Sequence, residues 1–117
     1  MARILIVDDE PDLRFLHKLI FKDAGHEVAV ASDGAAALEW VKNERPDLVV
    51  TDIMMPVMDG NQLIRSLRSD PETASIPILA VSANPGVVEG ADAVLQKGSG
   101  TARILETARS LINGERP

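Results

Sequence analysis

Residues 48–60, LVVTDIMMPVMDG, carry the strongest structural signal in the chain. Its apolar run at 48–50 has no polar alternation, which is typical of a strand that is buried on both faces. The run leads to one carboxylate, Asp52, and a loop stiffened by Pro56 then reaches the turn pair at 59–60. A single acid at the mouth of a buried strand makes Asp52 the candidate reactive group of the chain.

Short apolar runs and helical patterns alternate on both sides of this stretch. Strands are predicted at residues 3–7, 26–31, 47–51, 76–81 and 93–95, and the alternating run at 26–31 is placed nearer an edge of the sheet. Helices are predicted from Pro11 to Gly25, from a cap at 32–34 to Pro46, over 61–68, and from a cap at Ser99 or Thr101 to the pair at 113–114. Repeated β-α units predict an α/β fold, a doubly wound parallel sheet with helices on both faces and right-handed crossovers.

The composition indicates one domain, residues 1–117, and excludes some classes of binding partner. A chain of 117 residues that is 45% hydrophobic and 26% charged has the size and composition of a single globular core. The sequence has no long apolar run, no signal peptide and no cysteine, so we expect a cytoplasmic protein without a membrane span or disulfides. A net charge of −6 and an aromatic content of 3% argue against direct binding to nucleic acid.

Polar side chains stand where the predicted strands end. They are Asp8 and Asp9 after the first strand, Asp52 after the third, Ser82 after the fourth and Lys97 after the fifth. Ligands of parallel sheets bind at the carboxyl ends of the strands. If the first, third and fifth strands are neighbours, three carboxylates converge beside one ammonium and one hydroxyl.

These residue types indicate phosphoryl chemistry. Three like charges within a few ångströms repel each other, so one carboxylate would take up a proton unless a cation lies beside them. Mg²⁺ prefers a few carboxylate oxygens together with water and phosphate oxygens, and an ammonium and a hydroxyl are further ligands for phosphoryl oxygens. The set therefore indicates phosphoryl transfer to a carboxylate, with an acyl phosphate as the product.

Four short motifs resemble the receiver domain of two-component response regulators, and the resemblance covers essentially the whole chain. They are IVDDE at 6–10, DIMMPVMDG at 52–60, VSA at 81–83 and QK at 96–97. The resemblance implies a flavodoxin-like sheet of five parallel strands in the order 2-1-3-4-5. It also implies phosphorelay signalling, in which a histidine kinase or histidine phosphotransfer protein supplies the phosphoryl group and the receiver switches its interaction with a downstream protein.

The resemblance implies a role for each candidate residue. Asp52 would be the phosphoacceptor, Ser82 would hydrogen-bond the phosphoryl group and Lys97 would pair with it. The ligands of Mg²⁺ would be Asp8, Asp9, Asp52 and the backbone carbonyl of Met54. We expect a monomer or weak dimer that is not a dedicated enzyme but catalyses its own phosphoryl transfer and slow autodephosphorylation.

The chain departs from the family pattern between Ser82 and Lys97. These residues are only 15 positions apart, which predicts that the fourth helix of the fold is shortened or missing. Val94 stands where many receivers have a Tyr or Phe that turns inward, and Gly98 stands where a proline is usual. We therefore hypothesise that phosphorylation orders the loop at 83–92 instead of rotating an aromatic ring.

Two other functions compete with a phosphorylated receiver. One is a pseudo-receiver, a protein-binding module that is not phosphorylated, and the eroded 83–92 region keeps this alternative open. The other is a phosphohydrolase with an aspartate nucleophile, which would need a second acid two residues after Asp52, where Met54 stands instead. The intact acids, hydroxyl and lysine favour the phosphorylated receiver.

The first predicted helix carries Leu13, Leu16 and Ile20 at helical spacing. The two histidines, His17 and His26, are predicted to be surface residues, because neither lies at the carboxyl end of a strand. We expect no phosphohistidine or metal role for them.

Overall fold

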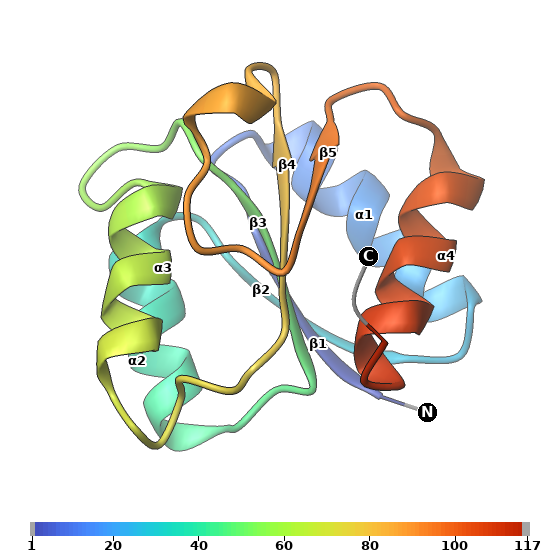
Figure 1. Cartoon of the computed structure of the whole chain (residues 1–117). Coiled ribbons are helices and arrows are strands. Elements are labelled where there is room, and N and C mark those ends of the chain that lie inside the picture. The colour runs from blue at the N-terminus through green and yellow to red at the C-terminus, as the bar shows by residue number, and fades with distance from the viewer. Residues whose placement is uncertain (1, 116–117) are drawn as a thin grey trace.

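The computed structural model describes residues 2–115, which form a sheet with helices on both faces (Figure 1). Its elements in chain order are β1 (Arg3–Val7), α1 (Pro11–Asp23), β2 (Glu27–Ala31), α2 (Gly34–Asn43), β3 (Leu48–Asp52), α3 (Gly60–Ser69), β4 (Ile78–Ser82), the 3₁₀ turn η1 (Pro85–Val87), β5 (Ala93–Gln96) and α4 (Thr101–Ile112). The five strands are parallel, in the order β2-β1-β3-β4-β5, with α1 and α4 on one face and α2 and α3 on the other. The predicted doubly wound fold and strand order are confirmed. Within the described residues, no helix is both long enough and apolar enough to cross a membrane.

β1, β3 and β4 are the interior strands of the sheet, and their sequences fit that position. They read RILIV, LVVTD and ILAVS, and nearly every residue in them is buried. Each has a parallel neighbour on both sides and helices over both faces, so no solvent-facing stripe of polar residues is present. β2 lies at one edge, as its alternation predicts, and its Val30 is exposed.

Alternate residues of β1 point into two separate cores. Ile4 and Ile6 pack on one face, with Phe21 of α1 and with α4, whereas Leu5 and Val7 pack on the other face with α2 and α3. Successive side chains of a strand point to opposite faces, so one short strand supports both cores. Complete burial of each Ile or Leu side chain stabilises the fold by about 1.5–3 kcal/mol.

α3 begins with a capping box that places the helix against the strand carrying Asp52. The side chain of Asp59 accepts a hydrogen bond from the backbone N–H of Gln62 at 2.9 Å, and the Gln62 side chain accepts one from the backbone N–H of Asp59 at 2.9 Å. Gly60 then packs so closely that an added Cβ would lie 2.3 Å from the backbone oxygen of Asp52. The first turn of α3 is therefore in contact with the end of β3.

The structure corrects several predicted positions in the sheet. β3 runs through Asp52, so the backbone of this residue belongs to the sheet. β4 begins at Ile78, two residues later than predicted, because Pro77 has no N–H to give to a neighbouring strand. β5 lies beyond β4 and not beside β3, so the condition that the first, third and fifth strands are neighbours is wrong for the fifth.

α1 buries a different face from the one that its leucines suggest. His17 and Phe21 are its buried residues, whereas Leu16 is 49% exposed. The prediction that His17 is a surface residue is therefore wrong, and His26 is only partly exposed. Apolar residues occur on both sides of this helix, so periodicity alone does not identify the inward face.

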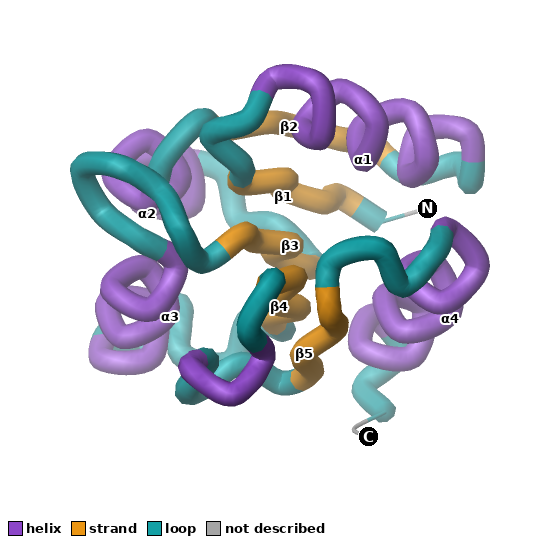
Figure 2. Tube along the Cα trace, turned by 90° about the horizontal axis from the view of Figure 1, so that it is seen from above, coloured by secondary structure: helices purple, strands orange, loops and turns teal. Residues whose placement is uncertain are grey.

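Residues 83–92, between β4 and β5, form a segment that we call the strap. It contains the three-residue turn η1 and no α-helix (Figure 2). This confirms the predicted loss of a helix at this point. The helix labelled α4 is the one that follows β5.

Candidate functional site

The carboxyl ends of the strands meet at one edge of the sheet, and three acids lie together there. Asp52 ends β3, and Asp8 and Asp9 follow β1, the neighbouring strand. The three residues each offer one carboxylate oxygen, and these oxygens lie within 4.8 Å of one another. Asp8 and Asp52 are 3% and 5% exposed, while Asp9 is exposed. The structure thus assembles the predicted acidic cluster.

Asp52 receives a hydrogen bond on each carboxylate oxygen. The backbone N–H of Ile53 donates to Oδ1 at 2.7 Å, and the ammonium of Lys97 donates to Oδ2 at 3.2 Å. The hydroxyl of Thr51 also donates to the backbone oxygen of Asp52 at 2.7 Å. The charge-assisted bond from Lys97 and the bond from Ile53 fix the orientation of the carboxylate.

Lys97 reaches Asp52 from two strands away. It follows β5, where its backbone N–H donates to the Ser82 carbonyl at 3.0 Å, and its long side chain reaches past the end of β4. Burial acts to lower the pKa of Lys97, but the hydrogen bond and charge of Asp52, together with the charge of Asp8, raise this pKa above its ordinary value. The lysine is therefore an ammonium ion at neutral pH.

Asp8 is oriented by the turn that leads into α1. Its Oδ1 accepts a hydrogen bond from the backbone N–H of Glu10 at 2.9 Å, and the Arg14 guanidinium donates to its carbonyl at 2.8 Å. Burial is the main cause that raises the pKa of Asp8; the Glu10 hydrogen bond lowers it in part, and the charge of Asp52 raises it further. The charged form of Asp8 is thus disfavoured in this site. Sequence reasoning missed Arg14, whose only local signal is its position one helical turn after Glu10.

The charges of the cluster do not balance. Three carboxylates lie together, and among the salt bridges found in the described residues only Asp52 of the three has a partner, Lys97. A hard divalent cation fits this donor set, because it prefers carboxylate oxygens and completes its coordination with water or phosphate oxygens. The acids that could hold Mg²⁺ are therefore the same ones that the sequence predicts.

Ser82 and Met54 complete the predicted set with different degrees of burial. Ser82 ends β4, is 2% exposed, and lies one residue beyond Val81, the register partner of Asp52. Its hydroxyl oxygen accepts a hydrogen bond from the backbone N–H of Asn84 at 3.1 Å. The side chain of Met54 is exposed, and the metal role of its carbonyl stays a prediction.

His17 is a neighbour of the site that sequence reasoning placed on the surface. Burial lowers its pKa, the positive charge of Lys97 lowers this pKa further, and the negative charge of Asp52 acts in the opposite direction. A neutral imidazole therefore lies within electrostatic reach of the pair formed by Lys97 and Asp52. Its spacing of four residues from Phe21, which places both on one helix face, is the signal that could have identified it.

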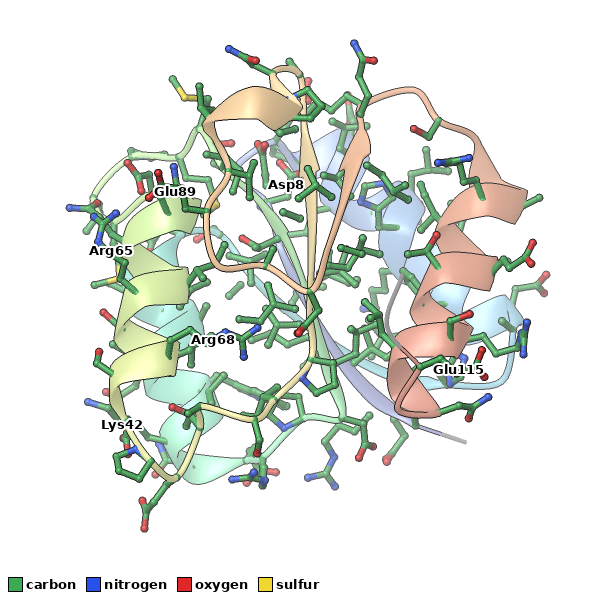
Figure 3. The ribbon with its side chains drawn as sticks, viewed as in Figure 1. Asp8, Lys42, Arg65, Arg68, Glu89 and Glu115 are labelled. Atoms are coloured by element: carbon green, nitrogen blue, oxygen red, sulfur yellow. The ribbon has the colours of Figure 1, made fainter. Side chains whose placement is uncertain are left out.

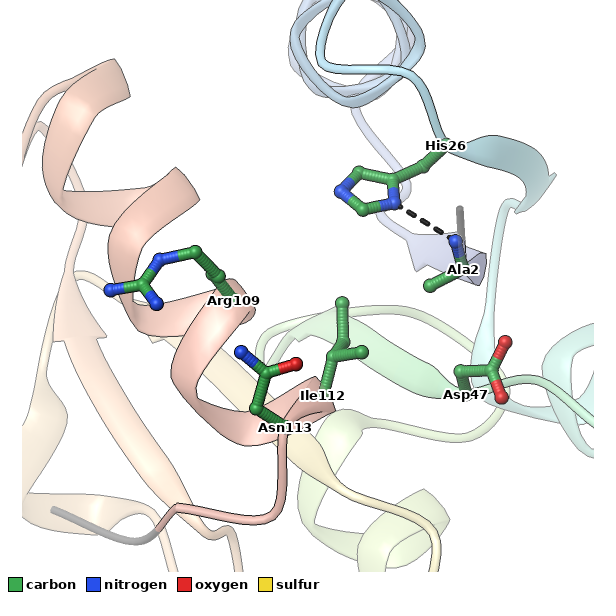
Figure 4. Close-up of a pocket in the computed structure, with 6 residues that line it drawn as sticks. All are labelled: Ala2, His26, Asp47, Arg109, Ile112 and Asn113. Carbon is green, nitrogen blue, oxygen red and sulfur yellow. Dashed lines mark hydrogen bonds between the residues drawn. The ribbon is translucent and has the colours of Figure 1, made fainter.

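A hollow of about 260 Å³ lies at the opposite end of the sheet from the acidic cluster (Figure 4). It is lined by Ala2, His26, Asp47, Arg109, Ile112 and Asn113. Two of its polar groups hold the start of β1: Nδ1 of His26 accepts from the Ala2 N–H at 3.1 Å, and Asp47 accepts from the Arg3 N–H at 2.7 Å. This hollow therefore has a structural explanation, and the acidic edge is the candidate site.

The fold and the site together define an α/β domain with an acidic cluster and a lysine at the carboxyl edge of its sheet, and comparisons with known proteins place it in a family. The sequence profile of the response regulator receiver domain matches residues 4–109. Protein PilH from Pseudomonas aeruginosa is 34% identical over 97% of this chain and 100% of its own length. The sensor histidine kinase TmoS from Ectopseudomonas mendocina is 48% identical over 71% of this chain, which spans 8% of the kinase. The crystal structure of the response regulator protein TrrA from Thermotoga maritima, in complex with Mg²⁺-BeF, has a TM-score of 0.87 at 29% identity, covering 95% of this chain and 99% of that one.

The chain belongs to the response regulator receiver domain family, and its class is that of phosphorylation-based two-component signalling. The chain spans all of PilH but only 8% of TmoS and 14% of a gliding motility regulatory protein from Myxococcus xanthus. The comparisons therefore identify the kind of domain.

Proposed function

We propose that Asp52 accepts a phosphoryl group from the phosphohistidine of a histidine kinase or a histidine phosphotransfer protein. The chain, 1–117, would act as one receiver domain whose aspartyl phosphate switches binding to a downstream protein. The observation that carries the proposal is a buried Asp52 carboxylate that bonds Lys97 at 3.2 Å within the acidic cluster. The three clustered carboxylates repel each other and so destabilise the fold. A protein-binding module without phosphoryl chemistry would gain nothing that offsets this cost.

The geometry supports a direct displacement at phosphorus. A carboxylate oxygen of Asp52 attacks the phosphorus atom of the phosphohistidine, so that an O–P bond forms and the N–P bond breaks. The imidazole leaves with the electron pair and takes up a proton. Lys97 pairs with the phosphoryl oxygens, and the hydroxyl of Ser82 donates a hydrogen bond to them. Attack by water on the same phosphorus would return the free carboxylate slowly, without a dedicated hydrolase.

Mg²⁺ is the cofactor that we propose for this reaction. The residues that would hold it are Asp8, Asp9, Asp52 and the backbone carbonyl of Met54. Bound there, the ion would neutralise the charges of the carboxylates and of the phosphoryl oxygens. Support comes from the oxygen-only donor set of the cluster and from the likeness to TrrA, whose crystals contain Mg²⁺-BeF.

Chemical labelling tests the proposal. After incubation with Mg²⁺ and acetyl phosphate, we expect the mass of the chain to increase by one phosphoryl group, and base should remove that group, as is usual for an acyl phosphate. The label should be absent in Asp52→Asn and after chelation of the metal. Asp23→Asn, which changes an acid at the end of α1 outside the cluster, should be labelled like the wild type. An unlabelled but folded wild-type chain would instead support the pseudo-receiver.

The outer face of α1 is the surface that we propose for docking the phosphohistidine donor. Phe15, Leu16 and Leu19 are 61%, 49% and 48% exposed on this helix, which begins two residues after Asp9. Of these three residues, Leu19 also lines a hollow of about 440 Å³ between α1 and α4. Its lining residues are Leu19, Ile20, Asp23, Ala24, Thr101 and Leu105. Exposed apolar side chains gathered beside a reactive site are typical of a protein-binding surface.

Replacement of Leu16 by serine should separate docking from chemistry. We expect at least about a tenfold loss in the rate of phosphotransfer from a phosphorylated histidine kinase that labels the wild-type chain, because an apolar contact residue is lost. Labelling by acetyl phosphate should be unchanged. Val87→Ser, at an exposed apolar position on the strap, is the matched control and should leave both rates unchanged. An equal loss with both donors would show that Leu16 acts on the site and not on docking.

A further inference from the structure

The strap is attached to α3 by a side-chain amide that takes the place of backbone pairing. The Asn61 Nδ2 donates to the Val87 carbonyl at 2.9 Å, and its Oδ1 accepts from the Glu89 N–H at 3.3 Å. One amide therefore bonds the carbonyl of one residue and the N–H of the residue two further on, as a neighbouring strand would. Because this segment contains no α-helix, the Val87 carbonyl and the Glu89 N–H would lack these hydrogen bonds without Asn61.

The following part of the strap is held by Arg68, at the far end of α3 (Figure 3). Its guanidinium donates to the Gly90 carbonyl at 3.1 Å and to the Asp92 carboxylate at 2.8 Å. Gly90 has φ +85°, and an added Cβ would lie 2.9 Å from Cγ2 of Ile64, so the strap lies directly on α3. Residues 87–92, the body of the strap, are thus fixed to one helix by Asn61 and Arg68.

The first part of the strap, residues 83–86, is bonded differently, and we call it the head. Its first turn is closed by the hydroxyl of Ser82, which accepts from the Asn84 N–H at 3.1 Å. Asn84 in turn accepts, through its carbonyl, the N–H of Val87 at 3.2 Å. The head therefore depends on the same hydroxyl that lies beside the acceptor strand.

Both attachments of the strap lead back to Asp52. Ser82 lies one residue beyond the register partner of Asp52. Asn61 follows Gly60, which contacts the backbone of Asp52. A change at this aspartate can therefore reach the strap through Ser82 or through the first turn of α3.

We propose that Asn61 is a positioning residue that confines the phosphorylation response to the head of the strap, while the body stays fixed on α3. This inference rests on the proposed function. When the Ser82 hydroxyl turns toward a phosphoryl group on Asp52, its oxygen leaves the Asn84 N–H and the first turn opens. The amide of Asn61 keeps Val87 and Glu89 in place, so the moving segment ends at Gly86. This differs from the hypothesis that the whole loop at 83–92 becomes ordered, because Asn61 and Arg68 hydrogen-bond residues 87–90 to α3.

Residue-resolved hydrogen exchange on the full chain tests this division. With Mg²⁺ and beryllofluoride as the phosphoryl mimic, we expect exchange of the Asn84 amide to speed up about five- to tenfold, as loss of one hydrogen bond predicts. Exchange of the Glu89 amide should not change. In Asn61→Leu, Glu89 should exchange faster in the resting protein and should also respond to the mimic.

Two further variants refine the comparison. Asn61→Asp keeps the acceptor for the Glu89 N–H but cannot donate to the Val87 carbonyl, so the Glu89 amide should keep most of its protection while the body of the strap begins to respond to the mimic. Lys42→Leu, at an exposed position of α2 near the opposite end of the sheet, should behave like the wild type (Figure 3). This control separates a specific role of Asn61 from a general effect of adding a leucine to a helix.

A fluorine NMR signal of bound beryllofluoride, present in the wild type and absent in Asp52→Asn, shows independently whether the site binds the mimic. Two results in the wild type would overturn the inference while the proposed function stands, provided that beryllofluoride binds. One is unchanged hydrogen exchange of the Asn84 amide, and the other is an equal change in exchange at Glu89 and Asn84. If Asn61→Leu behaves like the wild type, Asn61 has no positioning role. If no beryllofluoride binds to the folded wild-type chain, the proposed function fails, and this inference fails with it.

Discussion

Replacement of Asp8 by asparagine is expected to stabilise the metal-free protein and to remove most of its stabilisation by Mg²⁺. Burial and the charge of Asp52 disfavour the carboxylate of Asp8, so a neutral side chain of the same shape should raise the free energy of unfolding by about 1–2 kcal/mol at neutral pH. The Asn oxygen can still accept from the Glu10 N–H. Wild-type protein should gain about 2.7 kcal/mol at a Mg²⁺ concentration one hundred times its Kd, whereas the variant lacks one charged ligand.

The sign of the pH dependence follows from the raised pKa of Asp8. Because the folded protein binds this proton more tightly than the unfolded chain does, the carboxylate destabilises the fold at pH values above its folded pKa. As the pH falls through that value, the wild type becomes protonated and the difference between the two proteins shrinks. Below the ordinary pKa of an aspartate, the difference should be lost.

Urea denaturation at neutral and acid pH, with and without Mg²⁺, measures both effects. Glu106→Gln also removes one negative charge, from an exposed position in α4, and controls for net charge. It should leave the response to Mg²⁺ unchanged. A metal-free Asp8→Asn protein that is less stable than the wild type would contradict the electrostatic cost of the Asp8 carboxylate. A variant that keeps the full response to Mg²⁺ would contradict the proposed metal site.

Replacement of Gly60 by alanine is expected to destabilise the fold by about 2–3 kcal/mol. The new Cβ would lie 2.3 Å from the backbone oxygen of Asp52 and 2.8 Å from Cα of Ile53, so rigid backbone would have to move. Gly60 is not among the residues with positive φ, so the cost comes from the contact and not from the backbone conformation of the new residue. Since the contact is with Asp52 itself, labelling by acetyl phosphate should also slow.

Gly86→Ala is the matched control for this prediction. An added Cβ at Gly86 would have no neighbour closer than 3.6 Å, so its free energy of unfolding should change by less than about 0.5 kcal/mol. Thermal or urea unfolding of the two variants gives the comparison. Equal stability of the two proteins would mean that α3 is not docked tightly on the strand that carries Asp52.

The sequence predicts the sheet well because its interior strands have a strong signal. The runs that lead to Asp8 and Asp52 are apolar throughout, and only a strand with helices on both faces needs that composition. The acids and Lys97 follow from the same logic, since parallel strands end at one edge of the sheet. The missing helix before β5 is predicted from the 15 positions between Ser82 and Lys97, which are fewer than the receiver family usually has there.

The remaining features depend on contacts between distant residues. The four-residue spacing of His17 and Phe21 places both on one face of α1, but it does not show that this face turns inward and Leu16 outward. The helix has apolar residues on both sides, and the fold selects the face. The bonds from Asn61 to the strap join positions 26 and 28 residues apart, so no short motif encodes them. The local sequence pattern likewise does not show that β5 lies beyond β4 in the sheet.

The pair formed by Asp52 and Lys97 joins positions 45 residues apart across the strand between them. The acceptor therefore gains its cationic partner only after the last strand has docked. On the ribosome, a nascent chain would have its phosphoacceptor and acidic residues outside the exit tunnel well before the lysine follows. The complete pair of Asp52 and Lys97 would thus form only after residue 97 has left the ribosome and β5 has joined the sheet.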